Sequence, residues 1–186
     1  MKRLFDVILS IVLIIFLLVP MVIVALAVRL SSNGPILYWS NRIGERNVIF
    51  KMPKFRTMKT ETPDIATHLM KDPQQFLSPI GGLLRKYSLD ELPQLFSIFK
   101  GKMSFVGPRP ALFNQHDLIA LRTEKHVNKL LPGLTGWAQV NGRDDLSIHS
   151  KVLLDVEYME KKSFFFDLKI LWLTFIRVIK SSGISH

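Results

Sequence analysis

Residues 7–28 form an uninterrupted run of 22 residues without a charged side chain, in which only Ser10 and Pro20 lie outside the apolar set. As a straight helix this run would be about 33 Å long, which is enough to cross a hydrocarbon core of about 30 Å. The chain has 186 residues, so it has room for only one domain beside this segment. The run is therefore a candidate membrane segment.

Three interpretations of this segment differ in where they place its ends. A cleaved signal peptide would explain the basic start at Lys2 and Arg3, but its apolar part is normally shorter, about 7–15 residues. A spanning helix must place one basic end outside, although basic residues precede the run and Arg29 follows it, and positive charge favours the cytoplasmic side. A re-entrant helix keeps both ends on the cytoplasmic face, and Pro20 supports it because an interior proline bends a helix. Proline is also tolerated in spanning helices, so the residues leave these last two topologies open.

The charge balance points to an anionic partner. Lysine and arginine outnumber aspartate and glutamate by 25 to 15, which gives a net charge of +10. Nucleic acid, an anionic membrane surface and a phosphorylated substrate would each fit this excess. The absence of cysteine excludes disulfides, cysteine-ligated metals and thiol catalysis, and the five histidines show no metal-ligand pairing.

Residues 164–179 form a second apolar segment, whose uninterrupted apolar runs are too short to span a membrane. A polar set falls near one side of it at helical spacing: Asp167, Thr174, Arg177 and Lys180. An amphipathic helix lying in the membrane interface would show this pattern, and so would a core helix of the globular part. The residues leave both interpretations open.

The remainder predicts a small, mostly helical α+β domain. Short β-prone runs at 36–39 and 48–52 flank residues 44–47, a pattern typical of a β-hairpin. Residues 60–80 indicate a surface loop, and residues 132–143 indicate two turns around a short strand, with Asn141-Gly142 as a hairpin signal. Helices are expected at 80–87, 92–100, 112–130, 148–161 and 163–180.

The hexapeptide Ser88-Leu89-Asp90-Glu91-Leu92-Pro93 is the most informative for chemistry. Ser88 and Glu91 match a helix capping box, but Pro93 would then break a backbone hydrogen bond inside the helix. A helix that starts near Leu92 or Pro93 is more natural, and it leaves Asp90 and Glu91 at or just ahead of its N-terminus. Adjacent carboxylates suit a division of labour in which one attacks or binds Mg²⁺ and the other tunes or transfers protons. Taken alone, such a pair is usually solvated surface.

Arg109 lies between Pro108 and Pro110, which fix the backbone on both sides and limit where its guanidinium can reach. A pre-positioned guanidinium is a good bidentate ligand for phosphate. Without further context, a proline-rich turn with an exposed arginine is the commoner interpretation.

Other basic residues are candidates for phosphate or headgroup contacts. Lys54, Arg56 and Arg85 lie in basic clusters on either side of the 60–80 loop, and in isolation these clusters read as solvated faces. Arg143 ends the segment 132–143 and could reach a nucleotide phosphate.

Read together and in order, these segments resemble the bacterial sugar transferases, small monotopic phosphoglycosyltransferases that start the assembly of glycoconjugates. The likeness covers nearly the whole chain and looks closest to the short form of the family. It rests on the apolar helix with Pro20, Arg42-Ile43-Gly44, Lys54-Phe55-Arg56-Thr57-Met58, the stretch from Leu84-Arg85 to Leu95, Met103 to Pro110, and Pro132 to Arg143.

The resemblance implies a two-step reaction. Asp90 would attack the β-phosphate of a UDP-sugar, release UMP and hold the sugar-1-phosphate covalently until undecaprenyl phosphate takes it. Mg²⁺ would sit at Asp90, and Glu91 would assist proton handling or orientation. The implied substrate-binding set is Arg109, Arg85, Arg143, Lys54, Arg56, Pro108 and Pro110. The sugar itself is not implied, although an N-acetylated hexosamine derivative is the first candidate and a hexose the next.

The implied architecture is a re-entrant membrane helix at 1–30, followed by a catalytic domain at 31–186 with interfacial amphipathic helices. This domain would lie on the cytoplasmic face of the bacterial inner membrane. The implied partners are the UDP-sugar, undecaprenyl phosphate and membrane lipids, without nucleic acid, and a homodimer is left open.

Two positions depart from the family pattern. Val19 stands before Pro20 where the family often has serine, which puts the sharpness of the bend in question. Pro53 stands before Lys54 where an aromatic or aliphatic residue is usual, which puts the local strand pairing in question.

Two other functions are compatible with the residues. A glycosyltransferase that moves the sugar without its phosphate would release UDP and usually carries a D-x-D motif, whose spacing Asp144-Asp145 lacks. A membrane-anchored protein that binds anionic lipid or nucleic acid would need no catalytic carboxylates.

Overall fold

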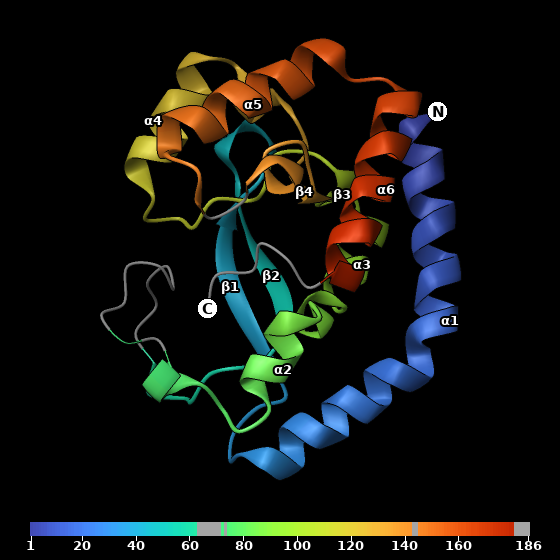
Figure 1. The fold of residues 1–186 in the computed structure, drawn as a ribbon, viewed down its shortest axis with the longest axis vertical. Helices are drawn as coiled ribbons and strands as arrows, with labels where there is room; N and C mark the ends of the chain where they lie inside the picture. Colours follow the sequence, from blue (N-terminus) through green and yellow to red (C-terminus); the bar gives the residue numbers. More distant parts are fainter. Residues whose placement is uncertain (63–71, 73, 143–144, 181–186) are drawn as a thin grey trace.

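A computed structural model of the chain describes residues 1–62, 72, 74–142 and 145–180 (Figure 1). The fold is mostly helical α+β, as predicted. The helices are α1 Lys2–Ser31, α2 Gly81–Lys86, α3 Gln94–Phe99, α4 His116–Glu124, α5 Ile148–Lys161 and α6 Phe164–Lys180. The strands are β1 Leu37–Ile43, β2 Ile49–Phe55, β3 Ser104–Val106 and β4 Gly133–Thr135. Short 3₁₀ turns are η1 Glu45–Asn47, η3 Gln74–Phe76, η4 Leu89–Glu91, η5 Val127–Lys129 and η6 Gln139–Asn141.

Helix α1 contains the whole predicted membrane segment and bends near its middle, in the part of the helix that contains Pro20 (Figure 1). The bend lets one face of the helix pack on the domain along both halves. Leucines of the first half, Leu9, Leu13 and Leu17, pack against the main core. The second half packs through Met21, Val24 and Val28 against β2 and α2. The opposite face is apolar and exposed, and it consists of Leu4, Ile8, Ile11, Val12, Ile15, Phe16, Leu18, Val19, Val22, Ile23, Leu26 and Leu30.

The N-terminal end of α1 is fixed to the domain by three charged side chains. Lys2 forms an ion pair with Asp167 of α6, and Asp6, which is only 2% exposed, accepts a hydrogen bond from the backbone N–H of Phe105 at 3.2 Å. The guanidinium of Arg3 donates to two carbonyls at the end of α3, at 2.6 and 2.7 Å. The charges that precede the apolar run therefore contact protein.

The C-terminal end of α1 is fixed to the same domain by Arg56, which follows directly after β2. Its guanidinium is buried and donates to the carbonyls of Ser32 and Asn33 and, at 2.8 Å, to the hydroxyl of Ser32. Arg29 in the last turn of the helix donates to the carbonyl of Gly34 at 3.0 Å. Both ends of α1 thus dock on one domain.

The predicted hairpin is confirmed, and its strands are longer than expected. β1 and β2 pair antiparallel, with Leu37 opposite Phe55 and Ile43 opposite Ile49. Pro53 stays in the ladder opposite Trp39. A two-stranded sheet leaves each strand an unpaired edge, so a proline that lacks an N–H can be accommodated there.

The prediction of a hairpin at Asn141-Gly142 is wrong. β3 and β4 pair parallel, with Ser104 opposite Gly133 and Val106 opposite Thr135, and Asn141 ends the 3₁₀ turn η6. The expected helix 112–130 is shorter and interrupted, because His126 adopts a left-handed conformation (φ 61°) between α4 and η5. The helices expected at 80–87, 92–100, 148–161 and 163–180 are confirmed to within two residues at each end.

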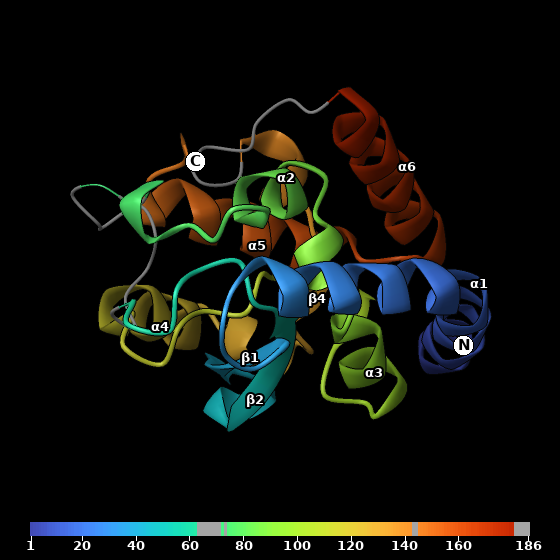
Figure 2. The ribbon, with the colours of Figure 1, turned by 90° about the horizontal axis from the view of Figure 1, so that it is seen from below.

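Helix α6 directs Asp167 and Thr174 to the domain and much of its apolar surface outward. Asp167 accepts a hydrogen bond from the Tyr158 hydroxyl at 2.8 Å, and Thr174 shares one with Thr135 at 2.6 Å. Ile170 is fully buried, whereas Phe165 and Trp172 are 81% and 62% exposed. Figures 1 and 2 show α6 beside the N-terminal half of α1, where the rings of Phe5 and Phe164 lie 5.4 Å apart.

Candidate active site

Asp90 and Glu91 form an acid pair in η4, between α2 and α3. Ser88 adopts a left-handed conformation (φ 54°) and caps no helix with its side chain, so the capping-box interpretation is wrong. α3 begins at Gln94 with Pro93 as its N-cap, close to the predicted start, and Asp90 and Glu91 precede it. Asp90 is only 6% exposed and Glu91 only 9%. They are therefore buried carboxylates and not solvated surface.

Two cations hold Glu91. Lys54 Nζ of β2 lies 2.7 Å from Glu91 Oε1, and Arg109 Nη2 lies 3.1 Å from the same oxygen. The ammonium of Lys54 is 3.9 Å from Asp90 Oδ2. The structure thus brings together Asp90, Glu91, Lys54 and Arg109, which the sequence predicts as site residues.

Burial dominates the electrostatics of Asp90. It raises the pKa of the Asp90 carboxyl above its ordinary value, and the adjacent Glu91 raises it further, whereas Lys54, Arg85 and Arg109 oppose the shift. Burial likewise lowers the pKa of the Lys54 ammonium, although the two carboxylates pull it upward. Charged groups out of water are costly unless they are paired, so these groups depend on one another for their ionised forms.

The carbonyls around Arg109 are each held by a hydrogen bond. The Pro108 carbonyl accepts from the Gly133 N–H at 2.9 Å, and the Arg109 carbonyl accepts from the Arg122 guanidinium at 2.7 Å. The Pro110 carbonyl accepts from the Arg42 guanidinium at 3.1 Å, and the Ala111 carbonyl accepts from the Ile43 N–H at 2.9 Å. The two prolines therefore lie in a backbone segment that four neighbours fix. This arrangement pre-positions the guanidinium of Arg109 beside Glu91.

Sequence reasoning missed the residues that support this segment. Arg122 of α4 forms a buried ion pair with Asp155 of α5 at 2.6 Å, and the same guanidinium binds the Arg109 carbonyl. Burial raises the pKa of Asp155, and Arg122 opposes that shift. The two charges are 33 residues apart, so no local pattern links them. Arg42 had a signal, since it lies in one of the segments that carry the family resemblance.

The other predicted site residues have different surroundings. Arg85 donates from Nε to Thr57 Oγ1 at 3.0 Å and is close enough to Asp90 to lower its pKa. Arg56 donates to Ser32 and Asn33 at the end of α1. Arg143 lies outside the described residues, and its predicted role stays a prediction.

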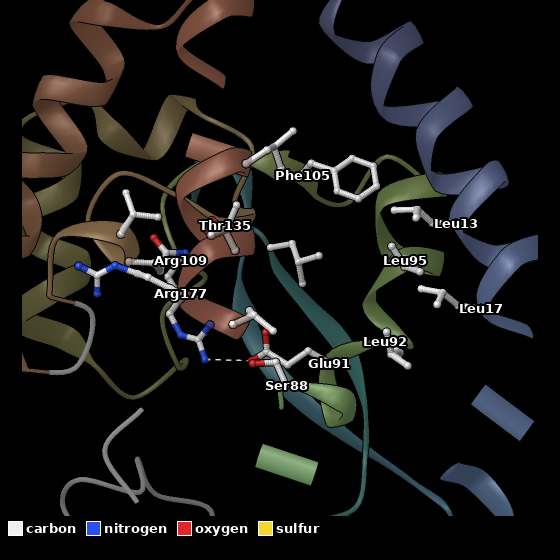
Figure 3. Close-up of a pocket in the computed structure, with 16 residues that line it drawn as sticks. Leu13, Leu17, Ser88, Glu91, Leu92, Leu95, Phe105, Arg109, Thr135 and Arg177 are labelled. Carbon is white, nitrogen blue, oxygen red and sulfur yellow. Dashed lines mark hydrogen bonds and ion pairs between the residues drawn. The ribbon is translucent and has the colours of Figure 1, made fainter. Parts of the chain in front are cut away.

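A cavity of about 260 Å³ opens beside the acid pair. Figure 3 shows Leu13 and Leu17 of α1, Leu92 just ahead of α3 and Leu95 of α3 on one side, Arg109 and Arg177 on the other, and Glu91 between them. The remaining lining residues are Ser88, Phe105, Leu134, Thr135, Gln139, Val140, Leu171, Thr174 and Val178. Glu91 of the acid pair therefore lines a mainly apolar space that is bounded by cations at one side, and Asp90 is its neighbour in the chain.

The donor set around the acid pair suits a magnesium ion better than a metal held by protein alone. No group of three or more His, Asp or Glu side chains is poised to share a metal ion within the described ranges. Mg²⁺ commonly binds through one or two carboxylates, with waters and substrate phosphates as its other ligands. Asp90 and Glu91 fit that pattern.

Comparison with known proteins gives one family. A family model described as bacterial sugar transferase matches residues 1–181. The uncharacterized sugar transferase EpsL of Bacillus subtilis (strain 168) is 43% identical over 188 residues, which cover 100% of this chain and 91% of EpsL.

Two relatives with more specific names are longer. The undecaprenyl-phosphate glucose phosphotransferase of Komagataeibacter xylinus is 39% identical, and the match covers 97% of this chain and 36% of that protein. The UDP-glucose:undecaprenyl-phosphate glucose-1-phosphate transferase of Escherichia coli (strain K12) is 36% identical over 94% of this chain and 39% of its own length. The chain thus spans little more than a third of these two relatives. It belongs to the bacterial sugar transferase family.

Proposed function

We propose that this chain transfers a sugar-1-phosphate from a UDP-sugar to undecaprenyl phosphate and releases UMP, as an initiating step of exopolysaccharide or capsule assembly. The names of its relatives supply the substrates and the reaction. The observation that carries the proposal is a buried acid pair beside Lys54 and Arg109, whose Glu91 lines a cavity between apolar helices. Such a site can bind a phosphate group away from bulk water, and it lies where a lipid can reach it.

Asp90 is the better placed of the two acids to act as the nucleophile. Glu91 Oε1 already accepts from two cations, whereas Lys54 Nζ is 3.9 Å from Asp90. A carboxylate whose lone pairs are not engaged at short range is the stronger nucleophile. Glu91 then acts by orientation, because it holds Lys54 and Arg109 at the site.

The two steps balance as displacements at one phosphorus atom. Asp90 Oδ forms a bond to the β-phosphorus of the donor, and the bond from that phosphorus to the bridging oxygen breaks, so UMP leaves with the electron pair. An oxygen of undecaprenyl phosphate then attacks the same phosphorus, and Asp90 leaves as a carboxylate. Arg109 and Arg85 neutralise charge on the phosphate oxygens. Magnesium bound at the acid pair would supply further neutralisation of the diphosphate.

We further propose that α1 is re-entrant and that the domain lies on the cytoplasmic face of the bacterial inner membrane. Both ends of α1 dock on the same domain, through Lys2, Arg3 and Asp6 at one end and Arg56 at the other. A helix that crossed the bilayer would have to separate those ends. The exposed apolar faces of α1 and α6 would lie in the lipid, and the inward polar side of α6 favours an interfacial helix over a core helix.

The reaction can be tested with purified protein in detergent, undecaprenyl phosphate, Mg²⁺ and a panel of UDP-glucose, UDP-galactose and UDP-N-acetylhexosamines. We expect UMP as the nucleotide product with one of these donors, and we expect Asp90→Asn to abolish its release. Asp117→Asn, which removes an exposed carboxyl of α4, is the matched control and should retain activity. Formation of UDP would indicate transfer of the sugar alone, and either UDP or no turnover across the panel would refute the proposal.

The topology can be tested in the same chain, because it has no cysteine. Two variants, each with a single cysteine at Lys2 or at Ser31, are treated in intact cells with a membrane-impermeant maleimide. Protection of both sites until the cells are opened supports the re-entrant helix. Labelling of only one site in intact cells would show that the ends lie on opposite sides and would refute the re-entrant helix.

A further inference from the structure

The cavity beside the acid pair has two chemically different sides. Leu13 and Leu17 of α1, Leu95 of α3 and Leu171 of α6 make one part apolar. Figure 3 shows Arg109 and Arg177 across the cavity from the leucines of α1 and α3. An occupant that matches both parts has an apolar body and an anionic end.

Arg177 is a cation of this cavity that the proposed chemistry has not used. It lies in α6 near Thr174, which also lines the cavity. No acidic side chain in the described part of the chain pairs with Arg177, in contrast to Arg109, which binds Glu91. A guanidinium at the wall of an apolar cavity attracts a phosphate strongly, because the low local dielectric strengthens charge-assisted hydrogen bonds.

Gln139 gives an independent indication of a polar ligand. Both its amide nitrogen and its amide oxygen are buried, and neither has a hydrogen-bond partner in the described chain. Buried polar atoms are nearly always satisfied in folded proteins. Since Gln139 lines the same cavity, a rotation of its side chain would bring this amide to a ligand with polar atoms.

The surroundings of the cavity favour a lipid phosphate over a nucleotide. A uracil base needs several hydrogen-bonding partners, and most of the lining is aliphatic or aromatic. Two of the helices that line it, α1 and α6, also carry large exposed apolar residues on their outer faces. A volume of about 260 Å³ is too small for a long polyprenyl chain and suits only its first units.

We propose that this cavity binds the phosphate end of the polyprenyl phosphate acceptor, with Arg177 as a ligand of the acceptor phosphate and the leucines around the first isoprene units. The assignment rests on the proposed function and adds the place where the second substrate enters. The acceptor phosphate would lie on the side of the cavity where Arg109 and Arg177 are, and Glu91 lines the same cavity.

The test separates the two half-reactions. Exchange of labelled UMP into the UDP-sugar needs only the first step, whereas transfer to undecaprenyl phosphate needs both. We expect Arg177→Met to change the exchange rate by less than about twofold and to raise the KM for undecaprenyl phosphate about ten- to hundredfold, as the loss of one charge-assisted hydrogen bond implies. Lys169→Met, which removes an exposed cation of the same helix, should leave both quantities unchanged.

A second measurement uses the unaltered enzyme, so it does not depend on how the variant folds. A short prenyl phosphate with a photoreactive group on its first units should label Leu95 or Leu171, and excess undecaprenyl phosphate, but not inorganic phosphate, should prevent the labelling. An unchanged KM in Arg177→Met, an equal loss of exchange, or labelling confined to other elements would overturn the acceptor site alone. Absence of both exchange and product in the wild type would overturn the proposed function and this site with it.

Discussion

Replacement of Lys54 by methionine removes an ammonium that lies within 4 Å of both acids and keeps most of the length of the side chain. Lys54 lies 2.7 Å from Glu91 and 3.9 Å from Asp90, and the side chains of Lys54 and Glu91 are only 14% and 11% exposed. The change therefore leaves two adjacent buried carboxylates with one counter-ion fewer. The effect should appear both in stability and in the pH dependence of activity.

The stability effect follows from the burial of the pair. Removal of one partner of a buried ion pair costs about 3–5 kcal/mol. The lower value, about 3 kcal/mol, applies to Lys54 because Arg109 still contacts Glu91. For a chain of this size that cost lowers the Tm by about 6–12 °C.

The matched control is Lys51→Met. Lys51 is an exposed residue of the same strand, opposite Asn41 in the ladder, and it should change stability by no more than about 0.5 kcal/mol. Thermal unfolding of both variants and the wild type in one detergent gives the comparison. Equal Tm values for the two variants would refute the account of the buried pair.

The pH effect has a defined sign. Lys54 lowers the pKa of Asp90, so its removal raises that pKa further above the ordinary value. The proposed nucleophile must be ionised to attack, and a higher pKa requires a higher pH for the same ionised fraction. The acid limb of kcat/KM for UMP release should therefore move to higher pH at a fixed Mg²⁺ concentration. A shift to lower pH, or none, would refute the electrostatic role of Lys54.

Four further predictions address other parts of the site. Asp90→Asn should abolish UMP release yet raise the Tm, because a raised pKa means that the ionised carboxyl destabilises the fold above that pKa, and Lys54 lies 3.9 Å from it, too far for a direct hydrogen bond. Asp155→Asn leaves Arg122 unpaired and loosens Arg109, so thermal unfolding should show a loss of about 3 kcal/mol and kinetics a higher KM for the UDP-sugar. Arg56→Met should lower the Tm, while kcat/KM of the folded enzyme stays within about threefold, since its guanidinium holds the end of α1. EDTA should stop UMP release, and added Mg²⁺ should restore it, with little change in Tm because Lys54 and Arg109 already neutralise the acids.

The helices that carry local signals could be predicted from the sequence, whereas the parallel strand pair could not. α5 was expected at 148–161 and occupies those residues, and the Ser147 hydroxyl caps it by accepting from the Ser150 N–H. β3 and β4 have three residues each, so neither is long enough to show a strand period. They also lie far apart in the chain, so no local pattern indicates that they pair. The break at His126 depends on a single left-handed residue, which is compatible with a helical pattern on both sides.

For the site, the sequence indicated the groups that we propose to react but not the groups that support them. Asp90, Glu91 and Arg109 lie in motifs whose composition points to chemistry. Arg122 and Asp155 are ordinary charges of two helices until tertiary packing buries them together. Arg177 belongs to the polar side of α6, and only the fold shows that it lines the cavity.

The outward and inward faces of α1 differ in the side chains that they require. The outward face meets only apolar surroundings in the proposed topology, so any aliphatic residue of suitable size would serve at Ile15 or Val22. The inward face supplies Asp6 to a backbone N–H and Leu13 and Leu17 to the cavity wall. A chimera that replaces α1 by an unrelated hydrophobic anchor would still reach the membrane, yet it would lack one side of the cavity beside Glu91.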